Sequence, residues 1–248
     1  MTKKGRVSVF LIGDNGGEIV AEALYFIEKK CAVCEEKFEV TYVRSRLALI
    51  KQDTDFCAYY KEINPYYYTV WACPHCGYAA RDIDFPEITT SAAKKIHTFL
   101  ADREIKVNLG GIRTREQAII AYQLAIFYAE LAADKASKRA GLYLRLGWLY
   151  RESGQDDEET IVLSKACECY DQALAQEPIP IGNLSELTVM YLIADLLRRT
   201  GKHEKAVLYL SQIVASPLAK NEKRIADLAR DLWQEIRRTD RTKLASTT

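Results

Sequence analysis

Two pairs of cysteines in the first third of the chain constrain its fold most strongly. Each pair has the form C-x2-C, with Cys31 and Cys34 in "CAVC" and Cys73 and Cys76 in "CPHC". Thirty-eight residues separate the two pairs. Two closely spaced thiols can reach one ion from a single turn, so two such turns can close a tetrahedral metal site. We therefore expect two turns that meet around a metal ion.

Zinc suits this set of ligands best, because thiolate is a soft ligand and zinc has no redox chemistry. Four protein sulfurs leave no position open for water or substrate, which is typical of a structural site. Gly77 permits the positive φ that such a turn often needs. A redox role for each pair is the alternative. We expect one structural Zn per chain, held in a small zinc-ribbon-like domain over residues 25–90.

The length and composition are those of a globular protein. The chain has 248 residues, of which 48% are hydrophobic and 28% charged, with a formal net charge of +1. The apolar run over residues 7–12 is too short for the core of a signal peptide. Nor does any stretch approach the roughly 20 apolar residues that span a bilayer. We expect a cytoplasmic protein without membrane insertion, in which thiols stay reduced.

Short strands are predicted in the first 90 residues. The apolar run over residues 7–12, followed by "GDNGG", predicts a strand and a turn, and the glycines fit neither common phosphate-binding pattern. Residues 1–24 are otherwise left unassigned. Alternation in "KFEVTYVR" places Phe38, Val40 and Tyr42 on one face. Further strands are predicted in "RLALIKQ" and "YYYTVWAC", with a turn at Asn64-Pro65 between them.

The rest of the chain is predicted to be helical, so the fold class is α+β and mainly α. A connecting helix and loop cover residues 91–114, with Ser91 as the helix cap. A long helix follows over residues 115–133. Its apolar positions recur at steps of three and four: Ala118, Tyr122, Ala125, Ile126 and Ala129.

Residues 115–238 resemble a tetratricopeptide array of about three helix pairs. The residues with this spacing are Tyr143, Leu146, Gly147, Tyr150, Gly154, Ala166, Tyr170, Ala173 and Pro178, then Met190, Ile193, Ala194, Leu197, Gly201, Ala206 and Leu210. Seven extra residues in the first unit equal two helical turns, so they can lengthen its second helix without rotating the buried face. Ser216-Pro217 is predicted to start the last helix, and residues 239–248 are predicted to form a flexible tail. A generic helical bundle is the alternative.

The segment "DTDFC" holds two acidic side chains and a thiol that do not belong to the predicted metal site. Asp53 and Asp55 could act as an acid pair or bind a cation. The simpler interpretation is that they pair with Arg44 or Arg46, or cap a turn. Cys57 is either a small buried residue or a reactive thiol.

Aromatic residues are concentrated around this segment, including Tyr59, Tyr60, Tyr67 and Trp71. Aromatic rings stack on bases in single-strand binders, usually beside basic charge. Residues 31–88 instead hold six Lys and Arg against nine Asp and Glu, a net charge of −3. Four thiolates around one Zn²⁺ make the region more negative still. This charge repels phosphate, so the pattern favours aromatic packing first, a protein-binding patch second and nucleic acid last.

Several of these motifs together resemble a bacterial family of uncharacterised zinc-ribbon proteins, domain of unknown function 2225. The resemblance rests on "CAVC", Arg44, "DTDFC", Tyr59-Tyr60, the "NP" at 64–65 and "VWACPHCGYAA". It implies a zinc ribbon followed by helices of repeat character, from about residue 25 onward. Residues 1–24 depart from the family pattern, and the family name implies no activity.

From these features we expect a non-enzymatic, zinc-stabilised adaptor. Its helices, or the aromatic patch, would bind another protein or another copy of the chain. One alternative is a nucleic-acid-associated zinc-ribbon regulator. The other is an enzyme that uses Asp53, Asp55 and Cys57.

Overall fold

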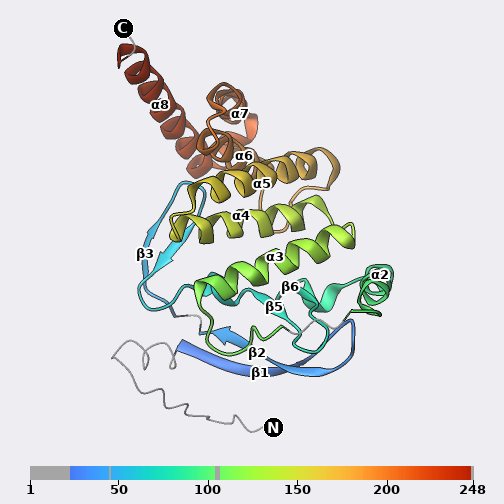
Figure 1. The fold of residues 1–248 in the computed structure, drawn as a ribbon. Helices are drawn as coiled ribbons and strands as arrows, with labels where there is room; N and C mark the ends of the chain where they lie inside the picture. Colours follow the sequence, from blue (N-terminus) through green and yellow to red (C-terminus); the bar gives the residue numbers. More distant parts are fainter. Residues whose placement is uncertain (1–22, 45, 104–106, 247–248) are drawn as a thin grey trace.

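The protein has a mixed α+β fold that is mainly helical (Figure 1). The computed structural model describes residues 23–44, 46–103 and 107–246, with the backbone alone described for 243–246. The strand and turn predicted over residues 7–17 lie outside these ranges. Small strand pairs occupy the N-terminal part of the described chain, and seven helices follow.

Three antiparallel hairpins form the β part. They are β1 (Leu24–Lys30) with β2 (Lys37–Val43), β3 (Leu49–Gln52) with β4 (Ala58–Tyr60), and β5 (Val70–Ala72) with β6 (Ala79–Arg81). In the register of the first hairpin Leu24 lies opposite Val43, and in that of the third Val70 lies opposite Arg81. The predicted alternation in β2 is confirmed for Phe38 and Val40, which are buried, but Thr41 is buried as well and Tyr42 only partly. The turns of the first and third hairpins hold the cysteine pairs.

The strand predicted over "YYYTVWAC" is wrong in its first half. Residues Pro65–Tyr68 form a short 3-10 helix, and the strand begins only at Val70. The Asn64 side chain accepts a hydrogen bond from the backbone N of Tyr66 at 2.9 Å, which caps this helix. Pro65 at the first helical position has its φ preset for such a turn. The local Asn-Pro capping therefore overrides the strand preference of three tyrosines.

The helices run from α2 to α8, and from α3 onward each packs against the next (Figure 1). Their bounds are α2 Thr90–Leu100, α3 Arg115–Leu131, α4 Ala136–Glu152, α5 Asp156–Gln176, α6 Glu186–Arg199, α7 His203–Ala215 and α8 Lys223–Ser246. Short 3-10 helices occupy Phe85–Glu87 and Pro217–Lys220. Among the described helices, none joins the length to the apolar character that crossing a bilayer requires.

The predicted helix limits are partly right. The apolar positions predicted for α3 are all buried, and Thr114 with Gln117 forms a capping box at its start. The cap of α2 is Thr89 and not Ser91, because the Thr89 side chain accepts from Ala92 N. Ser216-Pro217 starts a 3-10 turn, and α8 begins six residues after Pro217. It continues to Ser246, through most of the segment predicted as a tail.

The seven residues predicted to lengthen a helix lie in a long one. α5 has 21 residues, whereas α7 has 13. The residues predicted to face inward on α5, Ala166, Tyr170 and Ala173, are all buried. The added turns therefore extend α5 along its axis without turning its apolar face away.

The β5–β6 hairpin packs on α3, and a buried arginine fixes the loop between them. Arg113 donates hydrogen bonds to the carbonyl oxygens of Leu109, Tyr67 and Val70 at 2.6–3.0 Å. Burial lowers the pKa of Arg113 to about 10. Since these partners are neutral carbonyls, the guanidinium serves to satisfy backbone oxygens that the loop would otherwise leave unpaired. It holds the hairpin region against the start of α3.

Candidate metal centre and hairpin clasp

The four predicted cysteine ligands come together at the turns of two hairpins. Each offers a sulfur, and the four sulfurs all lie within 4.8 Å of one another. Sγ of Cys31 is 3.7 Å from that of Cys76, and Sγ of Cys34 is 3.6 Å from that of Cys73. A tetrahedral ion with metal–sulfur bonds of about 2.3 Å requires sulfurs about 3.8 Å apart. The cluster therefore has the dimensions of a closed four-thiolate site.

The two cysteine turns have the same backbone structure. In each, the first cysteine's N donates to the carbonyl five residues later, at 2.9 Å for Cys31 and 2.8 Å for Cys73. In each, the carbonyl oxygen of that cysteine accepts a hydrogen bond from the backbone N of the residue four positions later, at 3.1 and 2.8 Å. That residue has a positive φ in both turns, +65° at Glu35 and +78° at Gly77. The prediction for Gly77 is confirmed, and Glu35 adopts the same conformation without being glycine.

The electrostatics of the cluster favour a cation at its centre. Hydrogen bonds from Cys31 and Cys76 hold the pKa of Cys73 down at about 2. The same interaction with Cys73 raises the pKa of Cys31 to about 12, and burial adds to this effect. One thiolate thus suppresses ionisation of its neighbours, because like charges this close repel. A divalent cation would relieve this repulsion, and the donor set of four soft sulfurs fits one.

His75 lies inside the second cysteine turn but outside the sulfur cluster. Its ring is exposed, and Nε2 lies 3.2 Å from the carbonyl oxygen of Lys37. This contact links the second cysteine turn to the start of β2. His75 is therefore placed as a contact between the hairpins, as its position beside a full set of thiols suggests.

The β3–β4 hairpin carries no cysteine pair, and its tip contacts α4 and α6 instead. Asp55, at this tip, is fully buried. Its carboxylate accepts hydrogen bonds from Trp148 Nε1 at 3.0 Å and Arg151 Nη2 at 2.6 Å. The backbone N of Cys57 donates at 3.3 Å, and Arg199 Nη2 lies at 3.6 Å. Both carboxylate oxygens are thus occupied by groups of the protein.

Asp53 lies beside Asp55 and shares one of its partners. It accepts from Tyr59 Oη at 2.9 Å, Arg151 Nη1 at 3.1 Å and Lys51 Nζ at 3.2 Å. Burial alone would raise the pKa of Asp53, but the hydrogen bonds from Tyr59 and Lys51 outweigh it and lower the pKa. Arg151 also donates to Glu159 at 2.7 Å. One arginine therefore joins the tip to α4 and α5.

Thr54 and Phe56 extend the contact to α6. Thr54 Oγ1 donates to the buried carboxylate of Asp195 at 2.8 Å. Arg198 and Arg199 also donate to Asp195, at 2.8 and 3.0 Å. The Phe56 ring packs on Tyr191 with 5.6 Å between centroids. We call these contacts the hairpin clasp: Asp53–Phe56 on the tip, and Trp148, Arg151, Tyr191, Asp195, Arg198 and Arg199 on the helices.

The predicted partners of the two aspartates are wrong. The guanidinium of Arg44 lies 6.0 Å from the ring centroid of Tyr25, and Arg46 is exposed. Both precede β3, and the hairpin carries its tip away from them to the helices (Figure 1). The arginine partners come instead from α4 and α6, 96 residues or more along the chain, and Lys51 on β3 is a local partner of Asp53. The interpretation as a structural ion pair agrees with the geometry, but with different arginines.

A family model described as an uncharacterized protein conserved in bacteria (DUF2225) matches residues 24–236. The chain belongs to the DUF2225 family. No curated protein and no solved structure matches it. The family match spans both the cysteine cluster and the clasp, so the two sites lie within one family unit.

Cys57 of this DUF2225 protein is a buried thiol. Burial, together with the charge of Asp55, raises its pKa to about 12. A thiol with so high a pKa is almost entirely protonated near neutral pH, whereas nucleophilic cysteines depend on the thiolate. Its surroundings favour the packing role over the reactive one.

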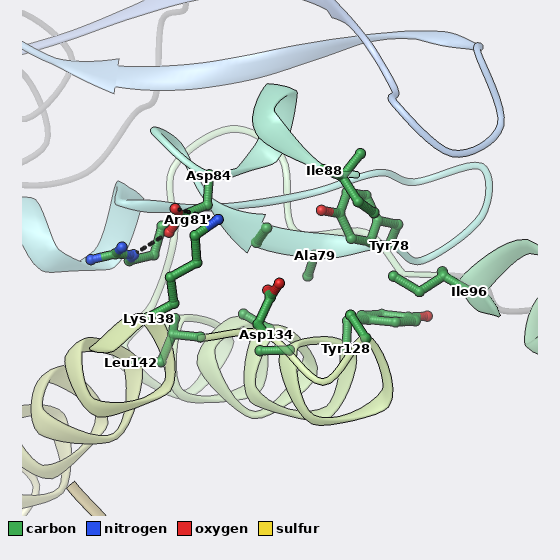
Figure 2. Close-up of a pocket in the computed structure, with 14 residues that line it drawn as sticks. Tyr78, Ala79, Arg81, Asp84, Ile88, Ile96, Tyr128, Asp134, Lys138 and Leu142 are labelled. Atoms are coloured by element: carbon green, nitrogen blue, oxygen red, sulfur yellow. Dashed lines mark hydrogen bonds and ion pairs between the residues drawn. The ribbon is translucent and has the colours of Figure 1, made fainter. Parts of the chain in front are cut away.

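A small pocket lies elsewhere, between β6 and the α3–α4 junction (Figure 2). It has a volume of about 20 Å³, which is room for about one water molecule. Asp84 is paired there with Arg81 at 2.5 Å and Lys138 at 3.1 Å, and burial raises the pKa of Asp134. Asp53, Asp55 and Cys57 do not line it. The cavity is too small for a substrate and is separate from the proposed acid pair.

The aromatic residues around the clasp are used in packing. Trp71 is buried and lies 5.7 Å, centroid to centroid, from Phe85. Tyr59 donates to Asp53, and Tyr67 Oη donates to Glu152 at 3.0 Å. Tyr60 pairs with Leu49 across the β3–β4 hairpin. Packing between strands and against helices was the favoured prediction for these rings, and their contacts agree with it.

Sequence reasoning missed the helical half of the clasp. Those residues carry a signal that could have found them: Trp148 and Arg151 precede the turn glycine Gly154 by six and three residues. Asp195 and Arg198 precede Gly201 by the same distances. Side chains at equal distances from two helix-ending glycines indicate a shared surface, which periodicity of apolar residues alone does not reveal.

Proposed function

We propose that the protein is a non-enzymatic adaptor, in which a zinc-stabilised ribbon is joined to a tetratricopeptide-like array that binds another protein. The observation that carries the proposal is the clasp. It occupies the residues that would otherwise suggest an enzyme. Asp55 has its hydrogen-bonding capacity filled by Trp148, Arg151 and Cys57. With its acids paired and its thiol protonated, this region has the chemistry of a structural contact.

Zinc as the metal is supported by the ligands and their spacing. Four thiolates within 4.8 Å of one another, two pairs of them 3.6–3.7 Å apart, suit a small tetrahedral ion without redox chemistry. When bound, the ion would neutralise part of the thiolate charge and hold β1–β2 to β5–β6. Cys31, Cys34, Cys73 and Cys76 would be its ligands, one ion per chain. A site closed by protein ligands has no role in catalysis.

The tetratricopeptide-like interpretation is supported by a close helix crossing at Gly147. An added Cβ there would lie 2.5 Å from Cδ2 of Leu163 on α5. Small residues at such crossings are typical of these repeats. The turns that follow α4 and α6 are also alike, with Gly154 N donating to Arg151 O and Gly201 N to Arg198 O. Repeated helix pairs of this kind form extended surfaces that bind proteins.

The crossing can be tested with Gly147→Ala. Alanine favours a helix, but here its methyl group would overlap Leu163, so we expect a net loss of about 1–3 kcal/mol in the free energy of unfolding. Gly141→Ala, on the same helix, is the matched control, since its Cβ would meet the flexible ends of Arg81 and Arg145 at 3.1–3.2 Å. Equal urea stability of the two variants would count against a tight α4–α5 crossing.

The nucleic-acid alternative has less support. The ribbon region is acidic, with a net charge of −3 over residues 31–88 before any thiolate is counted. Its tryptophan is buried, and bases stack only on accessible rings. An affinity capture of the metal-loaded protein, with and without nuclease, tests this. We expect an identified protein to be retained after nuclease and to bind again as a purified protein. Recovery of nucleic acid alone would overturn the adaptor proposal.

A further inference from the structure

The β3–β4 hairpin contacts the helices through its tip while its first strand stays exposed. All four residues of β3 are exposed, and Leu49 and Ile50 retain 58% and 65% of their accessible surface. At the tip, Asp55 is 0% exposed and Cys57 3%. A core strand would be buried along its length. The hairpin instead runs as an arm beside the ends of the helices (Figure 1), and its tip contacts Trp148 on α4 and Asp195 on α6.

The surface that receives the tip is the same face of two successive helix pairs. Relative to the turn glycines Gly154 and Gly201, its residues occupy identical positions. The equivalent pairs are Trp148 with Asp195 and Arg151 with Arg198. A repeated face of this kind is what helical arrays use as a continuous binding surface. The tip therefore lies where a bound peptide would lie.

The chemistry of this face selects an acidic turn. Arg151 and Arg199 lie 2.6 and 3.6 Å from Asp55, Arg198 and Arg199 also pair with Asp195 of the same face, and Tyr191 contributes a buried ring. The tip presents two carboxylates, two residues apart in sequence, and then the ring of Phe56. Arginine forks match carboxylates in charge and geometry, so the face discriminates strongly for this arrangement.

We propose that the tip is a built-in occupant of an acidic-peptide site on α4 and α6. A partner that presents an Asp-x-Asp-aromatic turn binds there by displacing it. This inference rests on the proposed adaptor function and names both the surface and the chemistry of the partner. In this exchange the partner's carboxylates take the positions of the Asp53 and Asp55 carboxylates. No arginine is left buried without a counter-charge, which would be strongly unfavourable.

The tether makes the tip a strong competitor. A short covalent connection gives it an effective concentration of about the millimolar range. A free peptide therefore binds the intact protein only through the small fraction of molecules whose face is open. Removing the tip should raise the apparent affinity for the peptide without any change in the face itself.

Removing the arm also removes Cys57 and Ala58, which are 3% and 7% exposed, so the deletion is paired with a milder variant. Lys61 N donates to Ala48 O at 3.0 Å, so the two chain ends beyond the arm already lie side by side. Residues 49–60 can be replaced by Asn-Gly, which closes a two-residue hairpin turn. The arginines are then open to water and not stranded in the interior. A milder second variant, Thr54→Ala with Phe56→Ala, loosens the tip and keeps its length.

The probe is a fluorescent cyclic peptide of residues 50–59, measured by anisotropy on the metal-loaded protein. We expect it to bind the shortened variant at least ten times more tightly than the wild type, and the milder variant to fall between them. The same peptide with Asn in place of both Asp residues should not bind. Arg199→Gln in the shortened chain should abolish binding, while Arg139→Gln, on the distant part of α4, should not.

Two results would overturn the inference: equal binding of the Asp and Asn peptides, or no binding to either tip-weakened variant when circular dichroism shows both to be folded. A result that rejects the acidic-peptide site can be distinguished from one that rejects the adaptor proposal. A captured protein that binds the wild type and the shortened variant equally well would keep the adaptor function and reject this site.

Discussion

The hairpin turns of this molecule are held in two different ways. The β1–β2 and β5–β6 turns are joined by four sulfurs within 4.8 Å. The β3–β4 turn is joined to the helices by carboxylates and guanidinium groups, with Arg151 at 2.6 Å from Asp55. A metal site gains its strength from one ion, whereas the clasp divides its contacts among several pairs whose attraction is offset by desolvation. The first should be rigid and the second exchangeable.

The largest effect is expected from removal of the metal. Structural zinc binding contributes about 10–16 kcal/mol in small domains, so Cys73→Ser should abolish the ordered β5–β6 hairpin. Metal analysis should find about one Zn in the wild type and none in the variant. Hydrogen exchange should show lost protection at 70–81 while α6 and α7 keep theirs. Cys167→Ser, in a buried thiol on α5, is the control and should retain the metal. An unchanged melting temperature after full removal would contradict a structural role.

A smaller but still large loss is expected at the centre of the clasp. Asp55→Asn removes a fully buried carboxylate that accepts from Trp148 and Arg151, although Arg151 keeps Glu159 and Arg199 keeps Asp195 as partners. The lost charged hydrogen bonds should lower the free energy of unfolding by about 1.5–3 kcal/mol. Asp53→Asn is the matched control, because Asp53 is 20% exposed and water can replace part of its contacts. We expect its loss to be about 1 kcal/mol. Urea unfolding measures both, and equal losses would mean that burial does not set the strength of the clasp.

The two sites also differ in how far they could be predicted from the sequence. Cys31 and Cys34 are neighbours, so their shared turn and ligand role follow from local spacing alone. The partners of Asp55 lie 93 and 96 residues away. Charge alone cannot select Arg151 over Arg44, which is much nearer in sequence. Long-range pairing depends on where the helices place each side chain.

The same contrast applies to the fold. The buried stripe of α3 was predictable because helical periodicity is local, as Ala118 and Tyr122 show. The 3-10 helix at Pro65–Tyr68 was missed because one capping contact from Asn64 outweighs the strand preference of three tyrosines. The direction of the β3–β4 arm was not predictable, since β3 itself buries nothing that would indicate its partner.

The smallest effect is expected at Cys57, whose pKa and rate of alkylation depend on whether the clasp is closed. Burial and the Asp55 charge raise its pKa to about 12 from an ordinary value of 9.0. Because the folded pKa is the higher one, this thiol contributes stability that is present below pH 9.0 and lost as the pH rises toward 12. Wild type and Cys57→Ala should therefore converge in stability over that range.

Alkylation gives a direct measure of the same property near neutral pH. In the closed clasp, iodoacetamide should modify Cys57 at least a hundred times more slowly than in urea, since both burial and protonation protect it. Asp55→Asn should accelerate the reaction at Cys57 and leave Cys167, also buried but on α5, unchanged. If the metal-bound protein alkylates Cys57 as fast as the Asp55→Asn variant, the clasp is already open in solution. The clasp and the metal site would then differ in the fraction of molecules in which each is formed, as well as in the strength of their contacts.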